Sequence, residues 1–181
     1  GIIAGIASGM LGVGGGVVFI PALLMLLPQL GISNEDTLII TIATSLFAGL
    51  FASTSSALNH FLKKNVDLRK ALFLAIGSIS AGYFSPRFIV NVNKDLLESI
   101  IAVILIFVFI KMFFGKEAEK NTKIRISEYW LLLIGIFVGL LSAATGMGGG
   151  VVILPILNIL YKMPVQKSAG TSSLVVASTL F

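Results

Sequence analysis

Cysteine is absent from this chain of 181 residues, and charged side chains make up only 12% of it. Without a thiol the chain can form no disulfide and can offer no thiolate ligand to a metal ion. An average soluble domain carries roughly 25% charged residues, whereas this chain is 56% hydrophobic with a mean hydropathy of +1.03. A soluble protein could not hide so much apolar surface, so we expect an integral membrane protein.

Patterns that carry enzyme chemistry or cofactor binding are also missing. The glycine-rich segments lack the G-x-G-x-x-G spacing of dinucleotide-binding turns, and no Lys-Ser or Lys-Thr pair directly follows them as in a phosphate-binding loop. Clusters of metal ligands and nucleophile triads are not visible, and the acidic residues fall in polar breaks or at the ends of apolar runs. We therefore expect no enzyme activity, no cofactor, no metal site and no nucleic-acid partner. Membrane topology explains the net charge of +5 better than nucleic-acid binding does.

What the chain does contain is a duplicated glycine-rich segment. Residues 1–26 and 135–160, laid side by side without a gap, are identical at 13 of 26 positions. They share the pattern G-x-G-G-G-V-V-x-x-P, whose glycines are Gly12, Gly14, Gly15 and Gly16 in one copy and Gly146, Gly148, Gly149 and Gly150 in the other. Duplicated apolar segments with glycine breaks in corresponding positions are typical of transporter binding sites.

Apolar runs divide the chain into two repeats of transmembrane helices, which predicts an all-α, polytopic bundle. The first repeat, residues 1–114, is expected to contain a broken hairpin and three spans, at 1–27, 37–58, 71–90 and 96–114. Residues 115–128 form a polar linker. The second repeat, residues 129–181, begins with a broken hairpin at 129–161 and a span that starts at 168 and is cut off, as in an internal part of a longer protein.

Two arrangements of the glycine clusters are open. About twelve helical residues on one side of a cluster cover about 18 Å, roughly half a bilayer. Each cluster is therefore either the tip of a re-entrant hairpin or a break in one long tilted crossing. Segments 59–70 and 111–128 hold four and five Lys or Arg residues, which makes the loops 59–70 and 115–128 cytoplasmic by the positive-inside rule. The charge distribution favours hairpins, and three spans between them would invert the second repeat.

The glycine tips are candidate anion sites. A helix that starts at each tip presents unpaired N–H groups and a partial positive charge, and glycine lets a ligand approach the backbone closely. Two hydroxyl pairs lie downstream, Thr44–Ser45 and Thr171–Ser172, and could donate further hydrogen bonds to an oxyanion. The alternative is that the glycines serve only tight turns and close helix packing.

The paired segments S-x-x-x-G-x-G-G-G-V-V-x-x-P, from Ser8 to Pro21 and from Ser142 to Pro155, resemble the TauE/SafE family of sulfite exporters and anion permeases. The later A-T-S-L at Ala43–Leu46 and G-T-S-S-L at Gly170–Leu174 are similar to the family's second signature. The resemblance implies secondary transport of sulfur-containing or organic anions. The substrate-binding residues that it implies are Gly12, Gly14, Gly15, Gly16, Thr44, Ser45, Gly146, Gly148, Gly149, Gly150, Thr171 and Ser172.

From these patterns we expect a permease that moves a small anion such as sulfite, a sulfonate or sulfoacetate by alternating access. Its surroundings would be the lipid of a bacterial or archaeal plasma (inner) membrane. One alternative is an anion channel with the same glycine-tip site, and another is a non-transporting membrane scaffold.

Overall fold

The computed structural model describes residues 16–89, 106, 129–146 and 148–181. In this part of the chain the regular elements are all helical, which confirms the all-α prediction. They are α2 (Gly16–Leu26), the short 3₁₀ helix η1 (Pro28–Leu30), α3 (Asn34–Leu62), α4 (Leu68–Ile89), α6 (Tyr129–Thr145), α7 (Gly150–Ile159) and α8 (Val165–Leu180). The expected span 96–114 and linker 115–128 lie outside the described residues, apart from Ile106.

Helix α3 is longer at both ends than the expected span 37–58. It begins after Ser33, whose hydroxyl oxygen accepts a hydrogen bond from the Asp36 N–H at 3.2 Å. The helix continues to Leu62, because it contains no proline and only one glycine, Gly49, that could interrupt it. Among the described residues, the segment Ile39–Leu62 of α3 is long and apolar enough to cross a membrane.

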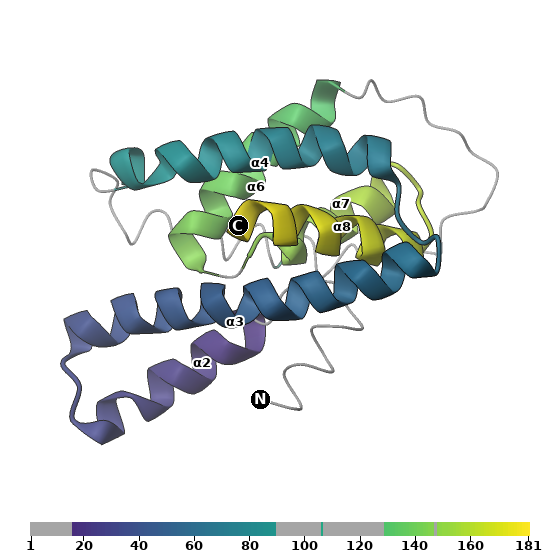
Figure 1. Cartoon of the computed structure of the whole chain (residues 1–181). Helices are drawn as coiled ribbons and strands as arrows, with labels where there is room; N and C mark the ends of the chain where they lie inside the picture. Colours follow the sequence, from purple (N-terminus) through teal and green to yellow (C-terminus); the bar gives the residue numbers. More distant parts are fainter. Residues whose placement is uncertain (1–15, 90–105, 107–128, 147) are drawn as a thin grey trace.

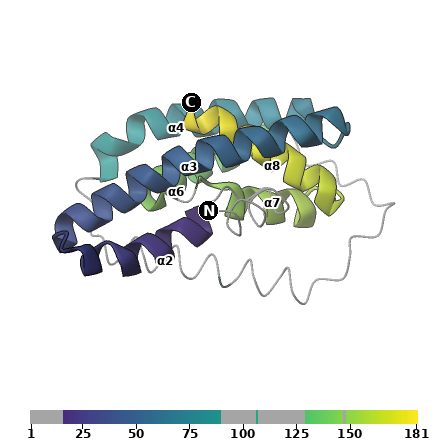
Figure 2. The same ribbon diagram turned by 60° about the horizontal axis from the view of Figure 1, so that its bottom comes forward.

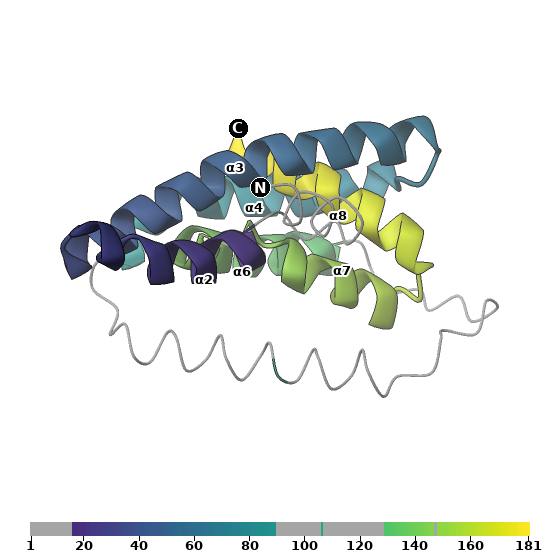
Figure 3. The same cartoon turned by 90° about the horizontal axis from the view of Figure 1, so that it is seen from below.

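The helices pack as a bundle in which elements of the two expected repeats alternate. Figures 1 and 2 show α8 lying between α3 and α4, with α6 packed along α4. Helix α7 contacts α8, and α2 lies along the first half of α3 (Figure 3). Segments that are far apart in the sequence therefore build one common interior.

Helices α4 and α6 approach each other closely through glycines. A Cβ atom added to Gly77 would lie 2.9 Å from the backbone nitrogen of Ile136, and one added to Gly139 would lie 2.8 Å from the Cα of Ser78. Such contacts are tighter than any real side chain allows, so only glycine permits this separation. Small residues serve the same purpose at helix interfaces in membranes.

The distribution of apolar and polar side chains on α3 is the reverse of that on a helix of a water-soluble protein. Its outward face carries Ile39, Phe47 and Phe51, which are 67%, 65% and 62% exposed. Its buried face carries mainly hydroxyl residues and small residues, namely Thr37, Thr41, Ser45, Gly49, Ser53, Ser56 and Ala57. Apolar side chains facing outward and small polar ones facing inward suit a helix that has lipid as its solvent.

Candidate functional site

The second glycine cluster forms a tight turn between α6 and α7. Gly146, Gly148 and Gly149 have φ angles of +70°, +78° and +69°, in the left-handed region that favours glycine. All three are buried. The run of glycines is therefore required by the backbone of the turn itself.

Helix α7 starts directly from this turn, with Gly149 as its N-cap. The N–H groups of Val152 and Ile153 donate to the Gly149 carbonyl at 3.1 and 3.2 Å. The N–H groups of Gly150 and Val151 precede the first intrahelical hydrogen bond, as at any helix start. Together with the helix dipole they give the start of α7 a partial positive charge.

Three helices enclose the turn. A Cβ atom added to Gly146 would lie 3.1 Å from Ile42 Cγ2 of α3, and one added to Gly149 would lie 2.6 Å from Val138 Cγ1 of α6. On the α8 side, Val176 Cγ1 would lie 3.2 Å from a Cβ on Gly148. The glycines leave no room for side chains of their own, so side chains of α3, α6 and α8 pack directly against the backbone of the turn.

Two of the predicted hydroxyl residues lie at the two ends of this turn. The Ser45 hydroxyl donates to the Gly146 carbonyl at 3.0 Å, across a sequence separation of 101 residues. The Ser172 hydroxyl lies 3.4 Å from the Gly150 carbonyl and donates to it. The structure thus brings Ser45, Ser172 and the second glycine cluster together from α3, α8 and the α6–α7 connection.

The other member of each hydroxyl pair lies elsewhere. Thr44 is exposed, while Ser45 beside it is buried. Thr171 is fully buried, but its hydroxyl donates to the Lys167 carbonyl at 2.7 Å and accepts from the Asp67 N–H at 3.0 Å. Thr171 therefore fastens the α3–α4 loop to α8, and its hydroxyl is engaged away from the glycine turn.

The first glycine cluster contributes one described residue. Gly16 is buried and is the first residue of α2. The predicted residues Gly12, Gly14 and Gly15 lie outside the described residues.

An ion pair joins the end of the α3–α4 loop to the first turn of α4. The Lys70 ammonium group donates to the Asp67 carboxylate. Burial by itself would raise the pKa of Asp67, but the hydrogen bonds from Lys70 and the charges of Lys70 and Lys167 outweigh it and hold that pKa below its ordinary value. Asp67 is therefore a carboxylate at neutral pH. The residues that the structure describes contain no group of three or more His, Cys, Asp or Glu side chains suited to a metal ion.

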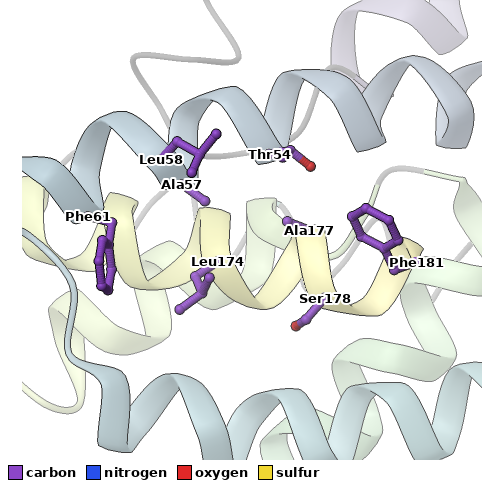
Figure 4. A pocket seen from close by; sticks show the side chains of 8 residues that line it. All are labelled: Thr54, Ala57, Leu58, Phe61, Leu174, Ala177, Ser178 and Phe181. Atoms are coloured by element: carbon purple, nitrogen blue, oxygen red, sulfur yellow. The ribbon is translucent and has the colours of Figure 1, made fainter.

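Two grooves open between the helices. One, of about 480 Å³, is lined by residues of α3, α4, α6 and α8, including Ser142 and Leu180, which also border the glycine turn. The other, of about 420 Å³, is apolar and lies between α3 and α8, where Phe61, Leu174 and Phe181 line it (Figure 4). The first groove adjoins the candidate site, and the second contains none of the predicted site residues.

The set of predicted site residues did not include two buried hydroxyl residues on the same helix as Ser45. Thr37 and Thr41 lie eight and four residues before Ser45, which places all three on one face of α3. They are 3% and 0% exposed. The four-residue spacing of hydroxyls in a long apolar run was the signal that could have identified them.

Comparisons with known proteins agree with the glycine motifs. The family described as "Sulfite exporter TauE/SafE" matches residues 1–181. A "Probable membrane transporter protein" of Methanocaldococcus jannaschii is 31% identical over 180 residues, which are 99% of this chain and 66% of that protein. A protein of the same description from Haemophilus influenzae is 26% identical over 184 residues, covering 100% of this chain and 70% of its own.

A plant protein is similar to a shorter part of the chain. "Sulfite exporter TauE/SafE family protein 3" of Arabidopsis thaliana is 37% identical over 82 residues, which are 45% of this chain and 16% of that protein. The chain thus spans about two thirds of the length of the two microbial relatives. No solved structure matches it.

Proposed function

The chain belongs to the sulfite exporter TauE/SafE family, and from this premise we propose that it is part of a secondary transporter in a membrane. The transported molecule is a small sulfur-containing or organic anion such as sulfite, a sulfonate or sulfoacetate. The anion binds at the glycine turns, and relative movement of the two repeats exposes it to the two sides of the membrane alternately.

The observation that carries this proposal is the turn at Gly146–Gly150. It combines left-handed glycines, the start of α7 and close contact with α3, α6 and α8. The glycines themselves add no side chain over the backbone N–H groups at the start of α7, so an anion could approach these groups closely once the enclosing helices move apart. Oxyanions such as sulfite offer several acceptor oxygens, which suits such a cluster of donors.

Ser45 and Ser172 supply further donors in the proposed site. In the structure their hydroxyls donate to carbonyls at the two ends of the turn. A rotation about χ1 would redirect each hydroxyl from a carbonyl to a bound anion. The same rotation would loosen the link between α3 and the α6–α7 turn, which couples occupancy of the site to movement of the helices.

The turn is buried in this structure, so an anion can reach it only after the helices move. Figures 1 and 3 show α6 and α7 extending from the turn toward the same end of the bundle, which supports the re-entrant hairpin. In the full proposal the first cluster, Gly12–Gly16, forms a second and inverted tip. In this proposal the α3–α4 loop (residues 63–67) and the segment 115–128 lie in the cytoplasm, beneath the plasma (inner) membrane.

Charge movement gives the proposed transport a direction. Export of one negative charge down an inside-negative potential is favoured by about 2.3 kcal/mol per 100 mV. Export can therefore run without a coupling ion, whereas uptake of the same anion requires one. Flux that is insensitive to voltage would count against electrogenic export.

The test is transport by the full-length protein in proteoliposomes, with labelled sulfite, taurine, sulfoacetate and thiosulfate as probes. We expect saturable flux of one of them, and stimulation by the same anion on the opposite side, which a channel does not show. Absence of flux for all probes under proton, sodium and voltage gradients would contradict the proposal.

Ser45→Ala is the informative variant in this assay. Removing one hydrogen bond of about 1 kcal/mol should raise the half-saturating anion concentration roughly 5-fold. Ser80→Ala is the matched control, since the Ser80 hydroxyl donates to a backbone carbonyl at 2.9 Å on α4, away from the turn. Equal half-saturating concentrations in both variants would remove Ser45 from the site.

A further inference from the structure

Two threonines on the buried face of α3 carry hydroxyl groups that no contact within the described fold explains. Thr37 is 3% exposed and Thr41 is 0% exposed. Among the residues that the structure describes, their hydroxyl oxygens have no hydrogen-bond partner. A buried polar group without a partner is unfavourable, and such groups in native proteins usually bond to water, an ion or a ligand.

Other threonines in α3, α6 and α8 avoid this cost by bonding to their own helix backbone. The hydroxyls of Thr54, Thr145 and Thr179 donate to the backbone carbonyl four residues earlier, at 2.7, 2.8 and 2.8 Å. A χ1 rotation is sufficient for this bond, and threonine in helices commonly adopts it. Thr37 and Thr41 do not make this bond, so their hydroxyls remain available to another partner.

The positions of the two threonines connect them with the candidate site. Thr37, Thr41 and Ser45 follow one another at intervals of four residues, on one face of α3. Ser45 bonds to the glycine turn through the Gly146 carbonyl. At 1.5 Å per residue, Thr41 lies about 6 Å and Thr37 about 12 Å from Ser45 along the helix axis. The three hydroxyls form a track from the beginning of α3 to the turn.

We propose that Thr37 and Thr41 donate hydrogen bonds to the transported oxyanion while it moves between the beginning of α3 and the glycine turn. The inference rests on the proposed anion transport and adds two specificity-determining residues to it. Neutral hydroxyls suit this role, because a conducting site must bind firmly enough for entry and weakly enough for exit. Between Thr37 and Asn59 helix α3 has no charged residue, so neither a trapping cation nor a repelling carboxylate lies along it.

The first test compares Thr41→Val with Thr41→Ser in proteoliposomes that contain the full-length protein. Valine keeps the shape and removes the hydroxyl, whereas serine keeps the hydroxyl. We expect Thr41→Val to lower kcat/KM for the anion at least 5-fold while its melting temperature stays equal or rises, and Thr41→Ser to retain most of the activity. Thr54→Val is the control on the same helix, because its hydroxyl already bonds to a carbonyl.

Unchanged transport by Thr41→Val would overturn the inference, and so would a loss of transport that serine does not restore. The first result would leave Thr41 as an unsatisfied core hydroxyl, and the second would make it a packing residue. In either case saturable flux by the wild-type protein would leave the proposed function intact.

A second test does not depend on transport. Because residues 1–181 contain no cysteine, Thr41→Cys can be probed with an anionic methanethiosulfonate reagent that itself carries a sulfonate group. The control is Val175→Cys, a position that is 0% exposed within the apolar core. We expect labelling at position 41, slowed at least 2-fold by sulfoacetate, and none at position 175.

Absence of labelling at position 41 would show that the anion does not pass Thr41, and it would overturn the inference even if the protein transports an anion. Labelling at position 41 without protection by sulfoacetate would show a path for water and overturn the binding of this anion. Failure of transport in the wild-type protein, with protected labelling at position 41, would instead contradict the transport mechanism and keep the anion-binding track.

Discussion

Alanine substitution at selected glycines tests whether the second glycine turn requires glycine for its backbone conformation and for its close packing. Gly31 has φ +81° and open space where a Cβ would lie. Gly149 has φ +69°, and its Cβ would lie 2.6 Å from Val138 Cγ1. Gly82, within α4, has no left-handed backbone, and its Cβ would lie 3.8 Å from Thr179 Cγ2. The three positions separate backbone strain, steric clash and helix propensity.

The expected magnitudes follow from these differences. Gly31→Ala should lose about 1–2 kcal/mol, the cost of a left-handed conformation for an L-residue. Gly149→Ala carries the same strain plus a typical overpacking cost of about 1–3 kcal/mol, so its total loss is about 2–5 kcal/mol. Gly82→Ala should be neutral or gain up to about 1 kcal/mol, because alanine is the better helix former.

The assay is equilibrium unfolding of the full-length protein in mixed detergent micelles, followed by helical circular dichroism as sodium dodecyl sulfate is added. Combining Gly149→Ala with Val138→Ala isolates the clash, since only the steric part should be relieved in the double variant. A loss at Gly149 no greater than that at Gly31, with no coupling to Val138, would refute the reasoning about the turn.

Two further outcomes concern the helix interface and the α3–α4 loop. Gly139→Ala should destabilise the protein by about 1–3 kcal/mol in the same assay, because its Cβ would lie 2.8 Å from Ser78 Cα; Gly49→Ala, which meets a leucine methyl at 3.5 Å, is the control that should show no such loss. Asp67→Asn should be less stable than wild type near neutral pH, because Lys70 lowers the pKa of Asp67 from 3.8. That stabilisation is present above the ordinary pKa and disappears as pH falls through the lowered folded-state value. The melting temperatures of the two proteins should therefore converge as the pH falls below the ordinary titration range of an aspartate; a constant difference would contradict the ion-pair explanation.

Apolar runs in the sequence coincide with helices that the structure describes. The expected span 71–90 and the first part of the expected hairpin 129–161 lie where α4 (Leu68–Ile89) and α6 (Tyr129–Thr145) are observed. A membrane helix must be long and apolar, and polar breaks must lie outside it, so its position can be read directly. The end of α3 was predicted less well. Asn59 and His60 were expected in a loop, but the helix continues through them to Leu62.

The candidate site was predicted only in outline. The glycine motif indicated a turn at Gly146–Gly150, and the turn requires positive φ at three of these positions. The sequence alone could not say which of two adjacent hydroxyls faces it. Neighbouring residues on a helix point about 100° apart, so the rotation of α3 in its packing brings Ser45 to the turn and leaves Thr44 exposed.

The sequence by itself determined the membrane character, the all-helical class and the place of the glycine breaks, because each depends on local composition and backbone freedom. The tertiary structure alone decided which groups meet. Ser45 reaches Gly146 across 101 residues, Thr171 turns to the Asp67 N–H, and Thr37 and Thr41 remain unpaired among the described residues. The physical reason is that close packing fixes the rotation and separation of each helix, and these depend on all its neighbours together.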